Sequence, residues 1–74
     1  MEYNENELES IGERIRSELG FSSISFDKKV SDELYFNVWD GEGIKDRVRF
    51  KPNAGLLYTY YQGQWKQVYG FKFD

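Results

Sequence analysis

Residues 33–50 of the chain are ELYFNVWDGEGIKDRVRF, and this stretch determines how the sheet is built. Two runs within it alternate between aliphatic side chains and aromatic or polar ones, which is the pattern of a β-strand with two distinct faces. Asp-Gly-Glu-Gly separates the two runs and is a strong hairpin signal. The stretch therefore predicts two antiparallel strands, at residues 33–40 and 44–51.

The length of the connecting loop determines which side chains share a face. A three-residue loop, Gly41-Glu42-Gly43, ends at a position with positive φ, which Gly43 adopts without strain. This register gathers the aliphatic residues on one face: Leu34, Phe36, Val38, Ile44, Val48 and Phe50. The opposite face receives three cross-strand pairs: Tyr35 with Arg49, Asn37 with Arg47, and Trp39 with Lys45. A shift of one residue would mix the two sets. We therefore expect the three-residue loop, which leaves Asp46 among the apolar side chains.

The composition describes one small domain, because 74 residues can bury a core near the lower limit for independent folding. Aromatic residues make up 19% of the chain, enough for a few large rings to fill that core. The sequence contains no cysteine and no histidine, which excludes a thiol nucleophile and removes the commonest general base and metal ligand. No apolar run reaches membrane-spanning length, and no apolar stretch typical of a signal peptide follows Met1. We expect a nearly complete, cytoplasmic chain.

Charge is unevenly distributed along the sequence. Residues 1–40 carry a net charge of −6, and residues 41–74 carry +3. One interpretation is attraction between an acidic helix and a basic sheet. The other is that the two halves present opposite surfaces to partners.

The first element predicted is a helix at residues 6–19. Asn6 followed by Glu9 resembles a capping box, and Gly20 is a natural stop. One helical stripe is apolar and consists of Leu8, Ile11, Ile15 and Leu19. Gly12 adjoins this stripe, where the missing side chain would let the helix approach an aromatic ring closely.

Three further strands are expected, at residues 21–26, 56–61 and 64–73. The first is rich in serine and is predicted to be an edge strand, followed by a polar turn at 27–32. A four-residue loop, Pro52–Gly55, pairs Phe50 with Leu57, and a two-residue turn at Gln62-Gly63 pairs Tyr60 with Trp65. A bulge at Gly70 would bury one set of side chains together: Val68, Phe71 and Phe73.

Short connections between successive strands favour an α+β fold in which the N-terminal helix packs on a five-stranded antiparallel meander. The alternative is a small barrel with an N-terminal helix, which resembles the SH3 and Sm folds in topology.

A helix covers one face of a sheet. If α-helical residues cover the aliphatic face, the opposite face stays open and is the candidate binding site. Its predicted residues are Tyr35, Trp39, Lys45, Arg47, Arg49, Tyr58, Tyr60 and Trp65, and Tyr69 is expected beside them. The competing interpretation is that these aromatic–cation pairs only stabilise the sheet.

No residue pattern indicates catalysis, because no nucleophile has an evident base. We therefore expect a non-enzymatic binding module without cofactor or metal, acting away from membranes. Its partner would be a protein or a second copy of the chain, since tyrosine, tryptophan and arginine are enriched at binding hot spots. The alternative is single-stranded DNA or RNA, whose bases stack on aromatic side chains flanked by cations. A pI near 4.9 weighs against this alternative unless the acidic helix faces away.

Overall fold

The structure is a computed structural model that describes residues 3–71, with the exception of the Tyr61 side chain. It contains one helix and five strands in the order α1 (Glu5–Leu19), β1 (Ser23–Val30), β2 (Glu33–Trp39), β3 (Lys45–Lys51), β4 (Leu56–Tyr61) and β5 (Gln64–Gln67).

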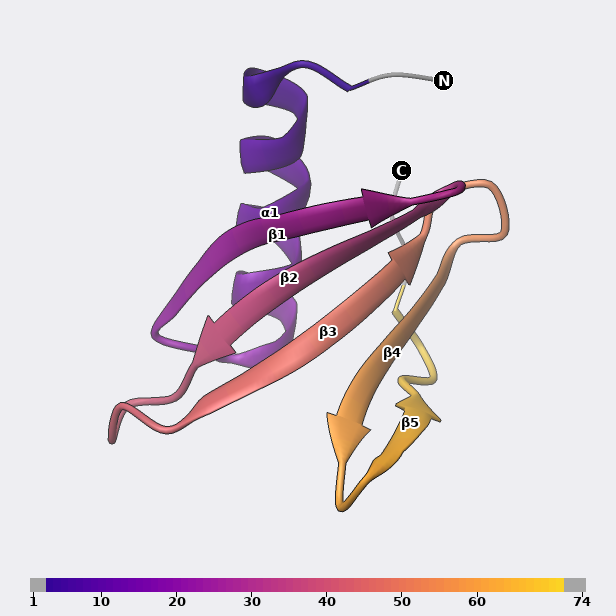
Figure 1. The fold of residues 1–74 in the computed structure, drawn as a ribbon. Helices are drawn as coiled ribbons and strands as arrows, with labels where there is room; N and C mark the ends of the chain where they lie inside the picture. The colour runs from indigo at the N-terminus through magenta and orange to yellow at the C-terminus, as the bar shows by residue number, and fades with distance from the viewer. Residues whose placement is uncertain (1–2, 72–74) are drawn as a thin grey trace.

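The five strands form one antiparallel sheet in which every strand pairs with its neighbour in sequence. Helix α1 lies across one side of this sheet, behind it in the view of Figure 1. The predicted α+β meander is therefore confirmed. The barrel alternative is wrong, because β1 and β5 lie at opposite edges of an open sheet.

The central hairpin has the predicted register. Phe36 pairs with Val48 and Trp39 with Lys45. Gly43 has a φ of 85° and its N–H donates to the Asp40 carbonyl oxygen over 3.1 Å. The Asp40 carboxylate also accepts hydrogen bonds from the backbone N–H groups of Glu42 and Ile44, at 2.8 and 2.9 Å. These local contacts close the three-residue loop and determine which face each side chain takes.

The two later loops also have their predicted lengths. Phe50 pairs with Leu57 across the loop that ends at Gly55, and Tyr60 pairs with Trp65 across the Gln62-Gly63 turn. Ile44 differs from the prediction. It precedes β3 at the hairpin tip and is 61% exposed, so it does not contribute to the buried aliphatic face.

Helix α1 begins at Glu5, one residue earlier than predicted, and its N-cap lies two residues earlier. Asn4, not Asn6, is the N-cap: its Oδ1 accepts from the Glu7 N–H at 2.8 Å, and the Glu7 carboxylate accepts from the Asn4 N–H at 3.3 Å. Both asparagines are followed by glutamate three residues later, so the motif does not distinguish them. With Asn4 as the N-cap, Tyr3 and Leu8 occupy the N′ and N4 positions, which form a hydrophobic staple. Both side chains pack against the core.

Strand β1 is longer and later than predicted. It spans Ser23–Val30 instead of 21–26, and the polar turn shrinks from 27–32 to the two residues after Val30. A β-bulge at Asp27 accounts for the difference. The extra residue lets the charged segment continue the pairing with β2 beyond Phe26. The prediction that this strand lies at an edge is confirmed.

Strand β5 is shorter than predicted, ending at Gln67 instead of residue 73. Gly70 has a φ of 84° and lies in a turn, so it is not a bulge within the strand. The chain bends back behind the sheet (Figure 1), and the Phe71 ring meets the Phe50 ring edge-to-face with centroids 5.9 Å apart. Val68 and Phe71 thus pack against the core as expected, whereas Phe73 lies outside the described residues.

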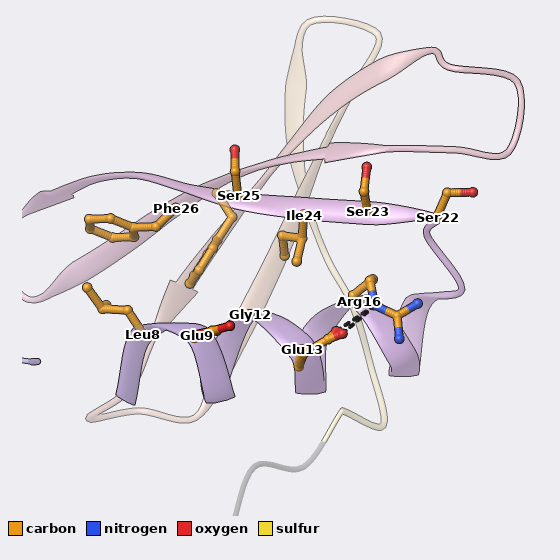
Figure 2. Close-up of a pocket in the computed structure, with 11 residues that line it drawn as sticks. Leu8, Glu9, Gly12, Glu13, Arg16, Ser22, Ser23, Ile24, Ser25 and Phe26 are labelled. Atoms are coloured by element: carbon orange, nitrogen blue, oxygen red, sulfur yellow. Dashed lines mark hydrogen bonds and ion pairs between the residues drawn. The ribbon is translucent and has the colours of Figure 1, made fainter. Parts of the chain in front are cut away.

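The helix comes very close to the sheet at Gly12. A Cβ at this position would lie 3.2 Å from Phe36 Cε2 and 3.6 Å from Ile24 Cγ2. Figure 2 shows Ile24 pointing from β1 toward this part of α1, while Ser23 and Ser25 point to the other side. The predicted approach of Gly12 to an aromatic ring is confirmed, and the ring is Phe36.

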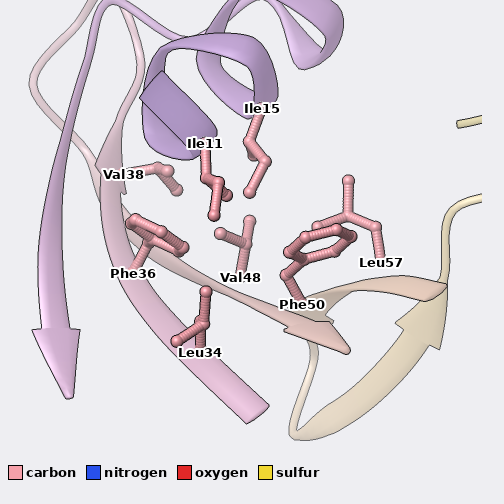
Figure 3. Close-up of a cluster of buried hydrophobic side chains, with 8 residues drawn as sticks. All are labelled: Ile11, Ile15, Leu34, Phe36, Val38, Val48, Phe50 and Leu57. Carbon is pink, nitrogen blue, oxygen red and sulfur yellow. The ribbon is translucent and has the colours of Figure 1, made fainter. Parts of the chain in front are cut away.

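The core lies between α1 and the sheet. It is entirely aliphatic and aromatic: Ile11 and Ile15 from α1, Leu34, Phe36 and Val38 from β2, Val48 and Phe50 from β3, and Leu57 from β4 (Figure 3). The exposed fraction of these side chains is 6% or less. Asp46 is half-buried beside them and accepts a hydrogen bond from the Arg47 N–H at 2.8 Å.

Candidate binding surface

The sheet face turned away from α1 carries aromatic and basic side chains from all five strands. Strand alternation places there the residues that lie between the core positions of β2, β3 and β4. We call this surface the aromatic–basic face. It comprises Lys28, Glu33, Tyr35, Trp39, Lys45, Arg47, Arg49, Lys51, Tyr58, Tyr60 and Trp65.

Arg49 is at the centre of this face. Its guanidinium carbon lies 4.6 Å from the centroid of the Tyr58 ring and 4.9 Å from that of Trp65. The side chain is only 20% exposed, and its Nε is buried without a hydrogen-bond acceptor in reach, 3.9 Å from the Glu33 carboxylate. Arg49 is therefore held by ring faces and by charge more than by hydrogen bonds.

Arg47 makes the same kind of contact one row away. Its guanidinium carbon lies 5.1 Å from the Tyr60 ring centroid and 5.9 Å from that of Trp65. The Trp65 ring also meets Tyr60 and Tyr35 edge-to-face, with centroids 5.1 and 6.0 Å away. Trp65, supplied by the shortest strand, thus connects rings and cations from three other strands.

Glu33 is an acidic member of the face that the sequence prediction missed. Its carboxylate lies 3.1 Å from Lys51 Nζ and accepts a hydrogen bond of 3.2 Å from the Tyr35 hydroxyl. Extending the predicted pairing of Tyr35 with Arg49 by two residues places Glu33 opposite Lys51, so the predicted register already indicated that Glu33 shares this face.

Lys28 is a second missed residue. Its Nζ lies 5.5 Å from the centroid of the Tyr35 ring. The bulge at Asp27 brings Lys28 opposite Tyr35, and no turn or capping motif in the sequence indicated that bulge.

Trp39 and Lys45 stand apart from this cluster. They pair with each other in the register, and Trp39 is half-buried while Lys45 is exposed. Within the described part of the chain, the Trp39 ring makes no ring or cation contact. Tyr69, expected on the same face, lies beyond β5 and is 84% exposed. The structure therefore brings together six of the eight predicted residues: Tyr35, Arg47, Arg49, Tyr58, Tyr60 and Trp65.

The two sides of the sheet differ in charge. The aromatic–basic face carries five lysine and arginine residues and one carboxylate among its described side chains. Helix α1 carries five glutamates and two arginines, a net charge of −3. Arg47 and Arg49 point away from α1, so direct attraction between acidic helix and basic sheet does not describe these residues. The alternative interpretation, two opposite surfaces, agrees with their placement.

Comparisons with protein-family models, curated proteins and solved structures give no match for this chain. Over residues 3–71, no helix has the length and apolar character needed to cross a membrane. The same residues contain no cluster of three or more acidic side chains arranged to hold a metal ion.

Proposed function

We propose that this protein is a non-catalytic binding module that recognises a protein partner through the aromatic–basic face. The observation that carries the proposal is the cluster around Trp65, where four rings and two guanidinium groups occupy a sheet face that α1 does not cover. Large surfaces of this kind mark interaction sites, and their residue types are those of binding hot spots.

The arrangement of the rings supports a protein partner in preference to a nucleic acid. Guanidinium groups already lie over Tyr58, Tyr60 and Trp65. A stacked base would need those ring faces, or would have to displace the arginines from them. A protein partner can instead use the edges of the rings and place carboxylates beside the cations.

A single-stranded nucleic acid is retained as the second candidate because of one observation. The glutamates of α1 lie on the side of the sheet opposite to the aromatic–basic face. The acidic pI therefore does not oppose phosphate binding at this face, which itself has an excess of four positive charges.

Trp39 is the residue that best tests the proposal. Its ring makes no contact with the other rings or cations of the described chain, so Trp39→Ala should leave the Arg47 and Arg49 contacts intact. As a half-buried aromatic anchor on the same face, it should contribute about 2 kcal/mol or more to binding, so its truncation should weaken affinity roughly thirtyfold. Tyr69→Ala removes an exposed ring outside the face and is the matched control.

The experiment is capture of partners from nuclease-treated lysate by the intact protein, compared among wild type, Trp39→Ala and Tyr69→Ala. A protein retained by wild type and Tyr69→Ala but lost with Trp39→Ala supports the proposal, and sedimentation of the purified chain identifies a second copy as that partner. Equal retention by all three proteins contradicts it.

Fluorescence of the two tryptophans distinguishes the second candidate. Quenching by short single-stranded DNA or RNA at low salt should fall steeply as salt is raised if phosphates are bound. If the quenching shows this salt dependence and Trp39→Ala weakens it without unfolding the protein, the proposed partner would be a nucleic acid and not a protein. Absence of quenching at low salt would eliminate the nucleic acid.

A further inference from the structure

A groove of about 550 Å³ lies on the other side of the sheet, between α1 and β1. Its apolar surface comes from Leu8 of the helix, from Ile24 and Phe26 of β1, and from Phe36 beneath them. Figure 2 shows Leu8 pointing toward Phe26 across the groove. Phe26 meets the Phe36 ring edge-to-face at 5.6 Å and is still 39% exposed. The groove is therefore an open apolar surface, separate from the aromatic–basic face.

One border of the groove is the free edge of the sheet. Strand β1 is the first strand in the sheet order, and no described strand pairs with its outer side. In an antiparallel strand, alternate residues direct their N–H and C=O groups away from the partner strand. The groove thus combines apolar pockets with a row of backbone donors and acceptors, which is the combination used to bind an extended peptide as an added strand.

The two halves of this edge differ. The second half contains the bulge at Asp27 followed by Lys28 and Lys29. Bulges and lysines are features that prevent pairing at sheet edges. The first half, Ser22–Phe26, has neither, and all five of its residues border the groove. A segment added to β1 would therefore pair with Ser22–Phe26.

The helix side of the groove is acidic. Glu9 and Glu13 line it together with Arg16. Arg16 Nε donates to both oxygens of Glu13 at 2.7 and 2.8 Å, and Arg16 also donates to the Phe21 carbonyl oxygen at 3.1 Å. The hydrogen bond that Arg16 donates to Glu13, together with the negative charge of that carboxylate, raises the pKa of the Arg16 guanidinium. Glu9 has no hydrogen bond or ion pair within the described chain, so it is available to a basic side chain.

Charge also weighs against a second copy of the chain as the occupant. Antiparallel pairing of two β1 edges around a two-fold axis would place both helices on the same side of the joined sheet. Two helices of net charge −3 would then lie next to each other. A basic segment would bring the opposite charge to the same place.

We propose that the α1–β1 groove binds an extended basic segment of a partner protein, which adds a strand to β1 at Ser22–Phe26. Alternate apolar side chains of the segment fill the groove beside Phe26, and a lysine or arginine of the segment pairs with Glu9. This site does not depend on the function proposed for the aromatic–basic face.

The test is selection of a random-peptide library on the intact protein. Enriched peptides should alternate apolar with other residues and contain lysine or arginine. Nuclear magnetic resonance with the most enriched peptide should shift the amide signals of Ser22–Phe26 and of Leu8–Arg16, while the indole signal of Trp65 stays in place. Binding should also slow amide hydrogen exchange at the outer edge of β1.

Two variants with matched controls test the contacts. Phe26→Ser should weaken binding of that peptide by about tenfold or more, since it removes an apolar anchor. Val30→Ser, at an exposed position of the same strand outside the groove, should leave it unchanged. Glu9→Lys should weaken binding severalfold, whereas Glu18→Lys, the same charge change on the same helix away from the groove, should not.

Enrichment of acidic or pattern-free peptides would overturn the proposal, as would failure to enrich any peptide that shifts Ser22–Phe26. Affinity insensitive to both Phe26→Ser and Glu9→Lys would do the same, and Glu9→Lys remains informative if Phe26→Ser fails to fold. Concentration-dependent dimerisation of the chain that Phe26→Ser abolishes would assign the groove to a second copy instead.

Discussion

Leu34, Val38 and Val48 are fully buried on one face of β2 and β3, whereas Tyr35, Trp39 and Arg49, on the other face of the same strands, remain partly exposed. The first group is covered by α1. The second has no covering element and is protected by contacts between neighbouring side chains, such as Arg49 against Tyr58 and Trp65. A helix packed over the sheet removes nearly all water from small aliphatic side chains. Packing of large amphipathic side chains beside one another leaves their polar atoms and ring edges accessible to solvent.

This difference assigns stability mainly to the face that α1 covers, and it leaves the aromatic–basic face accessible for the recognition proposed above. Burial of a large aliphatic or aromatic side chain contributes about 1.5–3 kcal/mol, and cation–π contacts contribute about 0.5–2 kcal/mol each. Substitutions on the covered face should therefore lower the free energy of unfolding more than equivalent substitutions on the aromatic–basic face.

The largest effect is expected for Phe36→Ala. Phe36 is 1% exposed and contacts the helix at Gly12. Its truncation should cost about 3–5 kcal/mol, a large part of the stability of a small domain. Denaturant titration measures this cost, and Arg47→Ala on the opposite face should cost far less. Equal losses at the two positions would show that the covered face is not the stabilising one.

The next largest effect is expected at Gly12, where helix α1 packs closely against the sheet. Gly12→Val would place a branched side chain against the Phe36 ring, which is enclosed by the core and cannot shift freely. We expect a loss of about 1–3 kcal/mol from overpacking. Ser17→Val, at an exposed position of the same helix, measures the helix propensity of valine without the contact. Similar thermal denaturation of the two variants would mean that α1 can move away from the sheet without cost.

A smaller effect is expected at the loop that separates the two faces. Gly43 has a φ of 85°, a conformation in which a β-branched residue is strained. Gly43→Val should destabilise by more than about 1 kcal/mol. Gly41→Val in the same loop is the control, since Gly41 lacks a positive φ and a Cβ there would meet only Ser22 Oγ, at 3.7 Å. If Gly43→Val is as stable as wild type, the three-residue loop with a positive φ at residue 43 is wrong, and so is the assignment of side chains to the two faces that depends on it.

The smallest effect is the coupling between Arg49 and Trp65. A double-mutant cycle with Arg49→Ala and Trp65→Ala should give an interaction free energy of about 0.5–1 kcal/mol, the value of a partly exposed cation–π contact. The same cycle with Lys45 in place of Arg49 should give a value near zero, because Lys45 is exposed and pairs with Trp39 instead. An interaction free energy as large as that between core residues would contradict the conclusion that the aromatic–basic face contributes less to stability than the covered face.

Much of the pairing could be predicted because it depends on short-range chemistry. Gly43, Gly55 and the Gln62-Gly63 turn each have positive φ values in loops of the predicted length. Once the loop lengths are correct, alternation places Tyr35 with Arg49 and Tyr60 with Trp65 without further information. The candidate surface was therefore accessible from the sequence as a set of residues sharing a face.

The errors arose where local signals were ambiguous. Asn4 and Asn6 start equivalent capping motifs, and packing of Tyr3 and Leu8 against the core favours the first. The bulge at Asp27 lengthened β1 and brought Lys28 onto the aromatic–basic face. Strand β5 ended early because the chain after Gln67 turns back to pack Phe71 on Phe50. Each outcome depends on side chains that are distant in sequence.

The sequence by itself determined the order of the elements, the register of three hairpins and the division of side chains between two faces, because turn geometry and strand alternation act over a few residues. Only the tertiary structure decided which rings meet which cations, how Trp65 connects four strands, and that a groove opens between α1 and β1. Those features depend on the twist of the sheet and the position of the helix, which result from packing the whole chain at once.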